Sequence, residues 1–144
     1  MKGQLILVID PGTDKSGIAI LNGAGEVITQ IVLLSQEFKD QLLYLDQRYQ
    51  PALWVIGDKN AGRETREVAK KTNWRKIPVF LQNEHRSSEE GRLLYWRAKP
   101  PTGLRGLIPT SFQVPQEPWD DWAAVVIGRR WLKENSSLKT ESKE

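Results

Sequence analysis

The stretch VIDPGTDKSGIAIL, residues 8–21, decides how the rest of the chain is interpreted. A continuous apolar run ends in Asp10, a Pro-Gly pair turns the chain, and a second apolar run begins at Gly17. An uninterrupted apolar run of this kind is typical of a strand buried on both faces. A charge at the tip of such a strand has two interpretations. Asp10 is either a turn residue before Pro-Gly, or the first ligand of a metal site.

Composition places the chain among ordinary globular proteins. Its 144 residues allow one domain with a real core. No apolar run approaches the roughly 18 residues of a membrane span, so we expect no membrane partner. The N-terminus does not resemble a secretory signal. The absence of cysteine excludes disulfides, thiolate ligands and cysteine nucleophiles, and it is compatible with a cytoplasmic location. A net charge of +3 permits a polyanionic partner without requiring one.

Turn residues and hydrophobic periodicity divide the chain into strands and helices. We expect strands at 4–10, 17–22, 27–34, 52–57 and 78–82, and helices from 35 to Pro51, at 63–72, at 87–96 and at 120–134. The last helix would turn a face of small and apolar residues inward: Ala123, Ala124, Ile127 and Trp131.

Residues 97–119 differ from the rest, because five of the eight prolines lie there. A loop of this length inside a compact domain is either functional or disordered. We therefore expect one domain over 1–134 that contains this long Pro-rich loop, followed by a polar, flexible tail at 135–144.

The order of elements predicts an α/β fold. Three strands joined by short loops form an antiparallel meander, and the later strands join the sheet through right-handed βαβ crossovers. The result is a mixed five-stranded sheet flanked by helices, with the fourth strand parallel to the first and next to it.

In this topology several carboxylates meet at one edge of the sheet. Asp10 ends the first strand, Asp58 ends the fourth, and Glu84 follows the fifth. The last helix brings Asp120 and Asp121 to the same edge, where open α/β sheets bind ligands. Carboxylates held close together require a compensating cation. Oxygen ligands without cysteine suit Mg²⁺ or Mn²⁺.

Each of these acids also has an ordinary structural interpretation. Asp58 is a plausible turn residue or helix cap, and Glu84 a solvated loop residue. Asp120 and Asp121 stabilise a helix N-terminus without any metal. His85, the only histidine, is compatible with a surface position. The residues alone therefore leave both interpretations open.

Three segments taken together resemble the RNase H-like superfamily and, within it, RuvC-like Holliday junction resolvases. The most similar family is YqgF/RuvX, also described as nucleases that process precursor 16S rRNA. The segments are LVIDPGTDKSGIAI at 7–20, VFLQNEHRSSEE at 79–90 and DDWAAVVIGRRWL at 120–132. The resemblance implies an RNase H-like fold and a Mg²⁺-dependent endonuclease.

Position by position, the resemblance places the catalytic, metal-binding acids at Asp10, Glu84 and Asp120. Asp58 or Asp121 would join the metal site in a variant of the family pattern. The resemblance also implies a homodimer, because a junction presents paired strands for cleavage.

The second segment departs from the family pattern. Asn83 stands where the family has Asp, and His85 where it has Arg, with Arg86 one position later. Ser87 and Ser88 meet the Ser/Thr positions. These departures affect substrate binding more directly than metal binding.

Our leading hypothesis is an endonuclease that acts on structured nucleic acid, either Holliday junction DNA or precursor 16S rRNA. Candidate nucleic-acid contacts are Lys15, Lys59, Arg63, Arg86, Arg105 and Ser87. The cations among them are equally ordinary as solubilising surface residues. The alternative is an RNase H-fold module with weakened catalysis that binds nucleic acid or the ribosome. Sugar kinases and Hsp70-like ATPases open with a similar Asp-x-Gly-Thr, but they close two such lobes over ATP.

Overall fold

The computed structural model describes the fold of residues 4–142 and the side chains of residues 4–135. Its strands are β1 Leu5–Asp10, β2 Lys15–Asn22, β3 Val27–Leu34, β4 Leu53–Gly57 and β5 Val79–Gln82. Its helices are α1 Ser35–Tyr49, α2 Arg63–Thr72, α3 Ser87–Ala98 and α4 Asp120–Ser142, with short 3-10 turns η1 Asn60–Gly62, η2 Gly103–Leu107 and η3 Thr110–Phe112.

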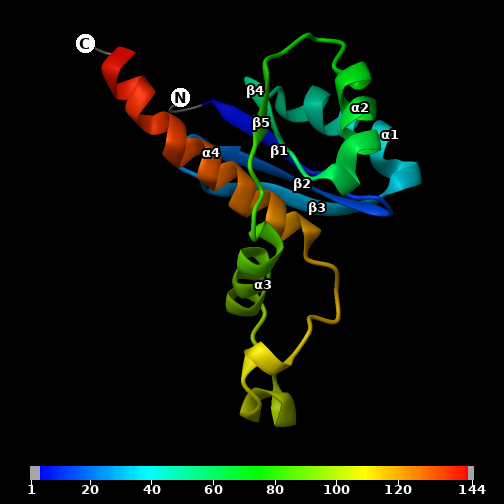
Figure 1. Ribbon diagram of the computed structural model, residues 1–144, viewed down its shortest axis with the longest axis vertical. Helices are drawn as coiled ribbons and strands as arrows, with labels where there is room; N and C mark the ends of the chain where they lie inside the picture. Colours follow the sequence, from blue (N-terminus) through cyan, green and yellow to red (C-terminus); the bar gives the residue numbers. More distant parts are fainter. Residues whose placement is uncertain (1–3, 143–144) are drawn as a thin grey trace.

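The strands form one sheet in the order β3-β2-β1-β4-β5 (Figure 1). β2 pairs antiparallel with β1 and with β3, whereas β4 is parallel to β1 and β5 is parallel to β4. The predicted mixed α/β sheet is confirmed, including the fourth strand beside the first.

The central strand β1 contributes to two separate cores because successive side chains point to opposite faces of a sheet. Ile6 and Val8 pack in the cluster beneath α4. Leu7 and Ile9 pack in the cluster that contains residues of α1 and α2. Figure 1 shows α4 crossing one face of the sheet, with α1 and α2 on the other. Burial on both faces explains why this strand is apolar throughout.

Glycine allows the first turn of α4 to approach β2 closely. Gly17 is the β2 partner of Asp10, and a Cβ atom at Gly17 would lie 1.9 Å from the carbonyl oxygen of Asp120. The predicted inner face of α4 is buried at Ala123, Ala124, Ile127 and Trp131. Gly17 therefore fixes the start of α4 beside the end of β1.

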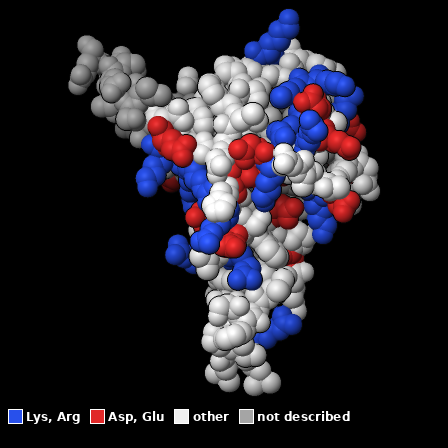
Figure 2. Space-filling view, viewed as in Figure 1, with Lys and Arg blue, Asp and Glu red and all other residues white. Residues whose placement is uncertain are grey.

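The Pro-rich segment projects away from the sheet below α3 (Figure 1). It begins after Ala98, two residues later than predicted, and contains η2 and η3. At its base Glu117 closes the neck, because its Oε1 accepts hydrogen bonds from Lys99 Nζ at 3.0 Å and from Tyr95 Oη at 3.1 Å. Figure 2 shows the projecting end almost without charge. Its exposed side chains are mostly apolar: Leu104, Leu107, Ile108, Phe112 and Val114.

The predicted end of the last helix at residue 134 is too early. α4 continues to Ser142, through most of the segment expected to be a tail. Residues 135–142 contain no glycine or proline that would end a helix. The expected flexibility of 135–144 stays a prediction, and residues 143–144 lie outside the described part of the chain.

Within residues 4–142, no helix combines the length and the apolar character that crossing a membrane would require.

Replacing Gly17 with Ala tests the close approach of α4. The new methyl group would meet the backbone of Asp120, which cannot rotate away. We expect the free energy of unfolding in urea to fall by about 1–3 kcal/mol. Gly106→Ala is the matched control, because its nearest neighbouring atom would be 3.3 Å away. Equal stability of the two variants would contradict this packing.

Candidate active site

The carboxyl ends of β1, β4 and β5 meet at one edge of the sheet, as the topology predicted. Asp10 is the last residue of β1, and its neighbour Ile9 pairs with Ile56 of β4. Gly57 of β4 pairs with Gln82 of β5, two residues before Glu84. Parallel pairing thus brings Asp10 and Glu84 to the same edge, the place where open α/β sheets bind ligands.

Asp10 and Glu84 form a buried pair of carboxyl groups. Only 7% of Asp10 and 1% of Glu84 is exposed to solvent. Burial, followed by the negative charge of Glu84 and a hydrogen bond with it, raises the pKa of Asp10 to about 8. Asp10 is therefore mostly protonated at neutral pH, because ionisation would place a second negative charge beside Glu84 in a buried site.

Glycine at position 57 makes room for this pair. A Cβ atom on Gly57 would lie 1.8 Å from Oε2 of Glu84. The Glu84 side chain thus occupies the space that a larger residue at the end of β4 would fill. Gly57, the last residue of β4, is therefore part of the site for a steric reason.

Lys59 is the nearest counter-ion of the pair. Its Nζ lies 3.2 Å from Oε1 of Glu84, and its backbone N–H donates to Oε2 at 3.2 Å. The charge of Lys59 acts to lower the pKa of Asp10. However, the Lys59 side chain is 41% exposed, so water screens part of its charge. Although Oε1 of Glu84 is in the ion pair, it is buried and accepts no hydrogen bond from the described residues.

Asp120 faces the same space from the first turn of α4. It is half-buried, and burial is the main cause that raises its pKa. Asp10 and Asp120 line one cavity of about 360 Å³, together with Lys15 and Lys59. The structure thus places Asp10, Asp120 and two of the predicted cations around one cavity, with Glu84 buried against Asp10.

Trp119 and Pro118 complete the wall of this cavity. The indole Nε1 of Trp119 donates to the backbone oxygen of Ser88 at 2.9 Å, which ties the end of the Pro-rich segment to α3. The sequence analysis did not place Trp119 at the cavity. Its position directly before Asp120, the first residue of α4, was the available signal.

The structure does not bring Asp58 or Asp121 into the cavity. Asp58 is exposed, and its Oδ1 accepts a hydrogen bond from the backbone N–H of Glu84 at 3.3 Å. Asp121 accepts from Gln30 Nε2 of β3 at 2.9 Å. Asp58 therefore shapes the turn that positions Glu84, and Asp121 ties α4 to β3. The expectation that either one joins a metal site is not supported by this arrangement.

Four of the six predicted nucleic-acid contacts do not line the cavity: Ser87, which is buried, and three arginines. Arg63 lines a neighbouring cavity of about 590 Å³ together with Gly12 and Thr13. Arg86 is exposed, with its Nε 3.9 Å from Glu89 Oε2. Arg105 lies in η2 of the projecting segment and is not among the residues that line the cavity. Of the Pro-rich segment, only Pro118 and Trp119 line the cavity around Asp10.

Asn83 and His85, which differ from the pattern of the family that the sequence resembles, lie in the turn after β5. Asn83 is exposed, and its Oδ1 accepts from the backbone N–H of His85 at 2.9 Å, which stabilises a turn. His85 is exposed. Ser87 is fully buried, and its hydroxyl has no hydrogen-bond partner among the described residues. Asn83 and His85 thus support the turn that carries Glu84 inward.

The residues present suit a divalent cation, although they do not form a complete site. No group of three or more acidic or histidine side chains converges as metal ligands anywhere in the described part of the chain. The buried Asp10–Glu84 pair nevertheless has hard oxygen donors, a raised pKa and an oxygen without a hydrogen bond. Such a pair gains from a cation of the Mg²⁺ or Mn²⁺ type.

Replacing Asp10 with Asn tests the electrostatic cost of the pair. Unfolded Asp10 would release its proton near pH 3.8, whereas folded Asp10 keeps it until about pH 8. In a buffer with a chelator, the free energy of unfolding of the wild type should therefore fall as pH rises through this window. Asp10→Asn should be more stable at pH 8 by at least about 1 kcal/mol, seen as a melting temperature higher by about 2–4 °C.

Asp58→Asn is the control for this experiment, because Asp58 is an exposed acid at the same edge. A flat pH profile for the wild type, or a loss of stability at pH 8 in Asp10→Asn, would contradict the raised pKa of Asp10.

Comparison with known proteins supports the fold. No protein-family model matches the chain, and no curated protein matches it. Thermus thermophilus RuvC in complex with a Holliday junction substrate has 12% identity and a TM-score of 0.58, over 86% of this chain and 90% of that chain. The Fowlpox virus resolvase in complex with Holliday junction DNA has 12% identity and a TM-score of 0.63, over 91% and 98%. The chain therefore has the RNase H-like fold of RuvC-type resolvases.

Proposed function

We propose that this protein is an endonuclease that hydrolyses phosphodiester bonds in branched nucleic acid, with Mg²⁺ or Mn²⁺ as cofactor. The observation that carries the proposal is the buried Asp10–Glu84 pair, which lies at the carboxyl edge of the sheet beside Asp120. The fold supports it, because two similar structures are resolvases with Holliday junction DNA.

In this proposal Asp10, Glu84 and Asp120 hold the cation. A divalent cation supplies Lewis acidity and neutralises the charge that develops on the phosphate. Asp120, at the wall of the cavity, would also accept a proton from the attacking water. Lys15 and Lys59 line the same cavity and attract the phosphate backbone. Trp119 and Pro118 cover one side and limit access of bulk water.

Branched DNA is the first substrate to test, because the similar structures were solved with Holliday junctions. The YqgF/RuvX-like motifs add precursor 16S rRNA as a second substrate. A homodimer in the cytoplasm, which would cut two strands of a junction, completes this proposal.

A binding module with weakened catalysis is a second candidate, and one observation favours it. Lys59 already pairs with Glu84, and three acids do not converge in the described residues. In this case the fold would bind nucleic acid or the ribosome through salt-dependent phosphate contacts, and divalent cations would bind weakly.

Cleavage of a synthetic four-way junction tests the nuclease proposal. We expect Asp10→Asn and Asp120→Asn to reduce the Mg²⁺-dependent rate at least about 100-fold, because each removes a carboxylate that acts on the metal or the water. The rate would be measured by gel under single-turnover conditions, with melting curves that establish folding.

Asp121→Asn is the matched control, because Asp121 is adjacent in sequence but bonded to Gln30. It should cleave within about threefold of the wild type, a difference below 1 kcal/mol. An unchanged rate in Asp10→Asn would contradict the assignment of this residue. A wild type that cuts neither the junction nor precursor rRNA would favour the binding module.

The competition between Lys59 and a divalent cation provides a further test. Lys59→Met removes the counter-ion of Glu84, so the metal-free variant should melt below the wild type at pH 8. Added Mg²⁺ should raise the melting temperature of Lys59→Met more than that of the wild type. Lys59→Arg, which keeps the charge, is the control. Equal shifts in all three proteins would indicate that cations do not bind at Glu84.

A further inference from the structure

A groove between α3 and α4 takes no part in the proposed nuclease site. It has a volume of about 350 Å³ and is lined only by residues of these two helices. It shares no lining residue with the cavity around Asp10. Its first α4 residue, Val126, lies almost two helical turns beyond Asp120, roughly 9 Å along the axis.

The floor of the groove is aliphatic. Leu93 of α3 is 55% exposed, although it lies in the middle of its helix. Leu94 and Val126 lie beside it, and Leu94 also packs against the core beneath α4. Contact between water and these neighbouring apolar side chains is unfavourable. An apolar side chain from a partner would therefore be stabilised here.

The rim of the groove is strongly basic. Four cations line it, against the single acid Glu90: Arg97, Arg129, Arg130 and Lys133. The formal charge of the lining equals the net charge of +3 of the whole chain, so the rest of the chain is formally neutral. A local excess of positive charge thus borders an apolar floor.

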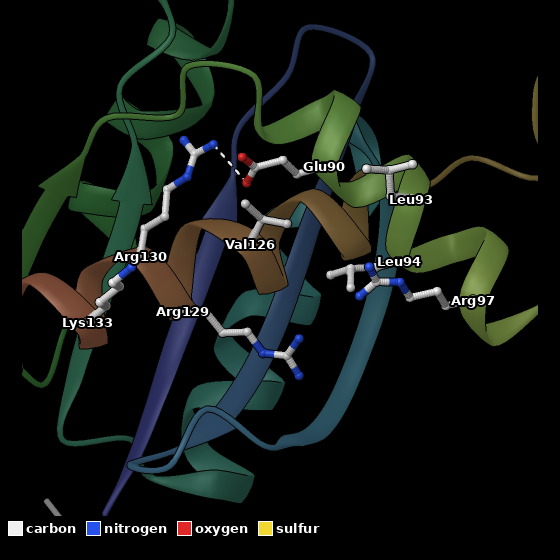
Figure 3. Close-up of a pocket in the computed structure, with 8 residues that line it drawn as sticks. All are labelled: Glu90, Leu93, Leu94, Arg97, Val126, Arg129, Arg130 and Lys133. Atoms are coloured by element: carbon white, nitrogen blue, oxygen red, sulfur yellow. Dashed lines mark ion pairs between the residues drawn. The ribbon is translucent and has the colours of Figure 1, made fainter. Parts of the chain in front are cut away.

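Two of the arginines are held in place before any partner binds (Figure 3). Arg129 Nε donates to the backbone oxygen of Gly25, in the β2–β3 turn, at 2.9 Å. Arg130 Nη2 lies 3.0 Å from Glu90 Oε2, and Arg130 Nη1 donates to the backbone oxygen of Asn83 at 3.3 Å. Fixed side chains lower the entropy lost on binding. In Figure 3 the side chain of Arg97 extends toward Leu94, which lies on the same helix.

We propose that this groove binds an acidic amphipathic helix of a partner protein. Leucine or phenylalanine side chains of that helix would fill the aliphatic floor, and its carboxylates would pair with the basic rim. The volume is within the usual range of about 300–1,000 Å³ for ligand sites.

Nucleic acid fits the groove less well than such a helix. A phosphate backbone carries no apolar group for the leucine floor. The lining, all of it in the described part of the chain, contains no aromatic side chain on which a base could stack. Charge and apolar floor together therefore favour an acidic, amphipathic partner.

Binding of a designed peptide tests the proposal. The probe is a fluorescein-labelled peptide of Leu and Glu, about four helical turns long, with all leucines on one face. A peptide of the same composition with scattered leucines is the control probe. We expect the first to bind with a Kd of about 1–100 μM and the second at least about tenfold more weakly. In nitrogen–proton NMR spectra, the shifted amides should cluster on α3 and α4.

Two single variants separate the floor from the rim. Leu93→Ser and Arg97→Glu change exposed positions, so the fold should persist, and each should weaken the peptide at least about fivefold, about 1 kcal/mol. Arg92→Glu is the matched control, since it makes the same charge change on α3 outside the groove lining. Junction cleavage by Arg97→Glu should equal that of the wild type.

Several results would overturn the proposal. These are equal binding of both peptides, an equal loss in Arg92→Glu, or amide shifts away from α3 and α4. If four-way junction DNA displaces the peptide and Arg97→Glu weakens DNA binding by the same factor, the groove is a nucleic-acid surface instead. All of these measurements are independent of Asp10, so they do not depend on whether the protein is a nuclease.

Discussion

The burial of two carboxyl groups side by side, Asp10 and Glu84, is the constraint on which the arrangement of this edge depends. Their proximity requires glycine at position 57, because any larger side chain would occupy the space of Glu84. It also accounts for the raised pKa of Asp10 and for the contact with Lys59. Gly17 then allows α4 to touch β2, which places Asp120 at the same edge. Two glycines in two strands thus make room for Glu84 and for Asp120 at one edge of the sheet.

A second buried acid in the same molecule shows how differently a structural carboxylate is treated. Asp46 on α1 accepts two hydrogen bonds from Arg75, both at 2.7 Å, and one from the indole of Trp54 at 3.0 Å. Its charge is fully compensated by fixed donors, as is usual for a buried ion pair. Among the side chains that the structure describes, only Lys59 forms an ion pair with the Asp10–Glu84 pair, and it is partly solvated. The cation that we propose would supply the compensation that fixed donors give to Asp46.

Hydrophobic periodicity was sufficient to predict the strands, the helices and the sheet order, because each element buries one or two regular faces. The meeting of Asp10 and Glu84 at one edge of the sheet followed from strand direction, and Asp120 reaches that edge through the packing of α4 on β2. The directions of the Asp58 and Asp121 side chains could not be predicted, because neighbours distant in sequence, Glu84 and Gln30, determine them. The ion pair between Lys59 and Glu84 was not predicted for the same reason, since the sequence analysis considered Lys59 only as a contact to phosphate. The extent of α4 was underestimated because a polar composition does not by itself end a helix.

An ion pair and a hydrogen bond at the neck of the projecting segment join the two ends of that segment. Glu117 joins Lys99 and Tyr95 at the base, while Trp119 fastens the returning chain to Ser88 at the cavity wall. Between these anchors, residues 100–116 form an excursion that contributes no residue to the lining of the cavity. Exposed loops tolerate changes in length and sequence better than buried elements do. A change in this excursion should therefore leave the residues around Asp10 and Asp120 in place as long as both anchors hold.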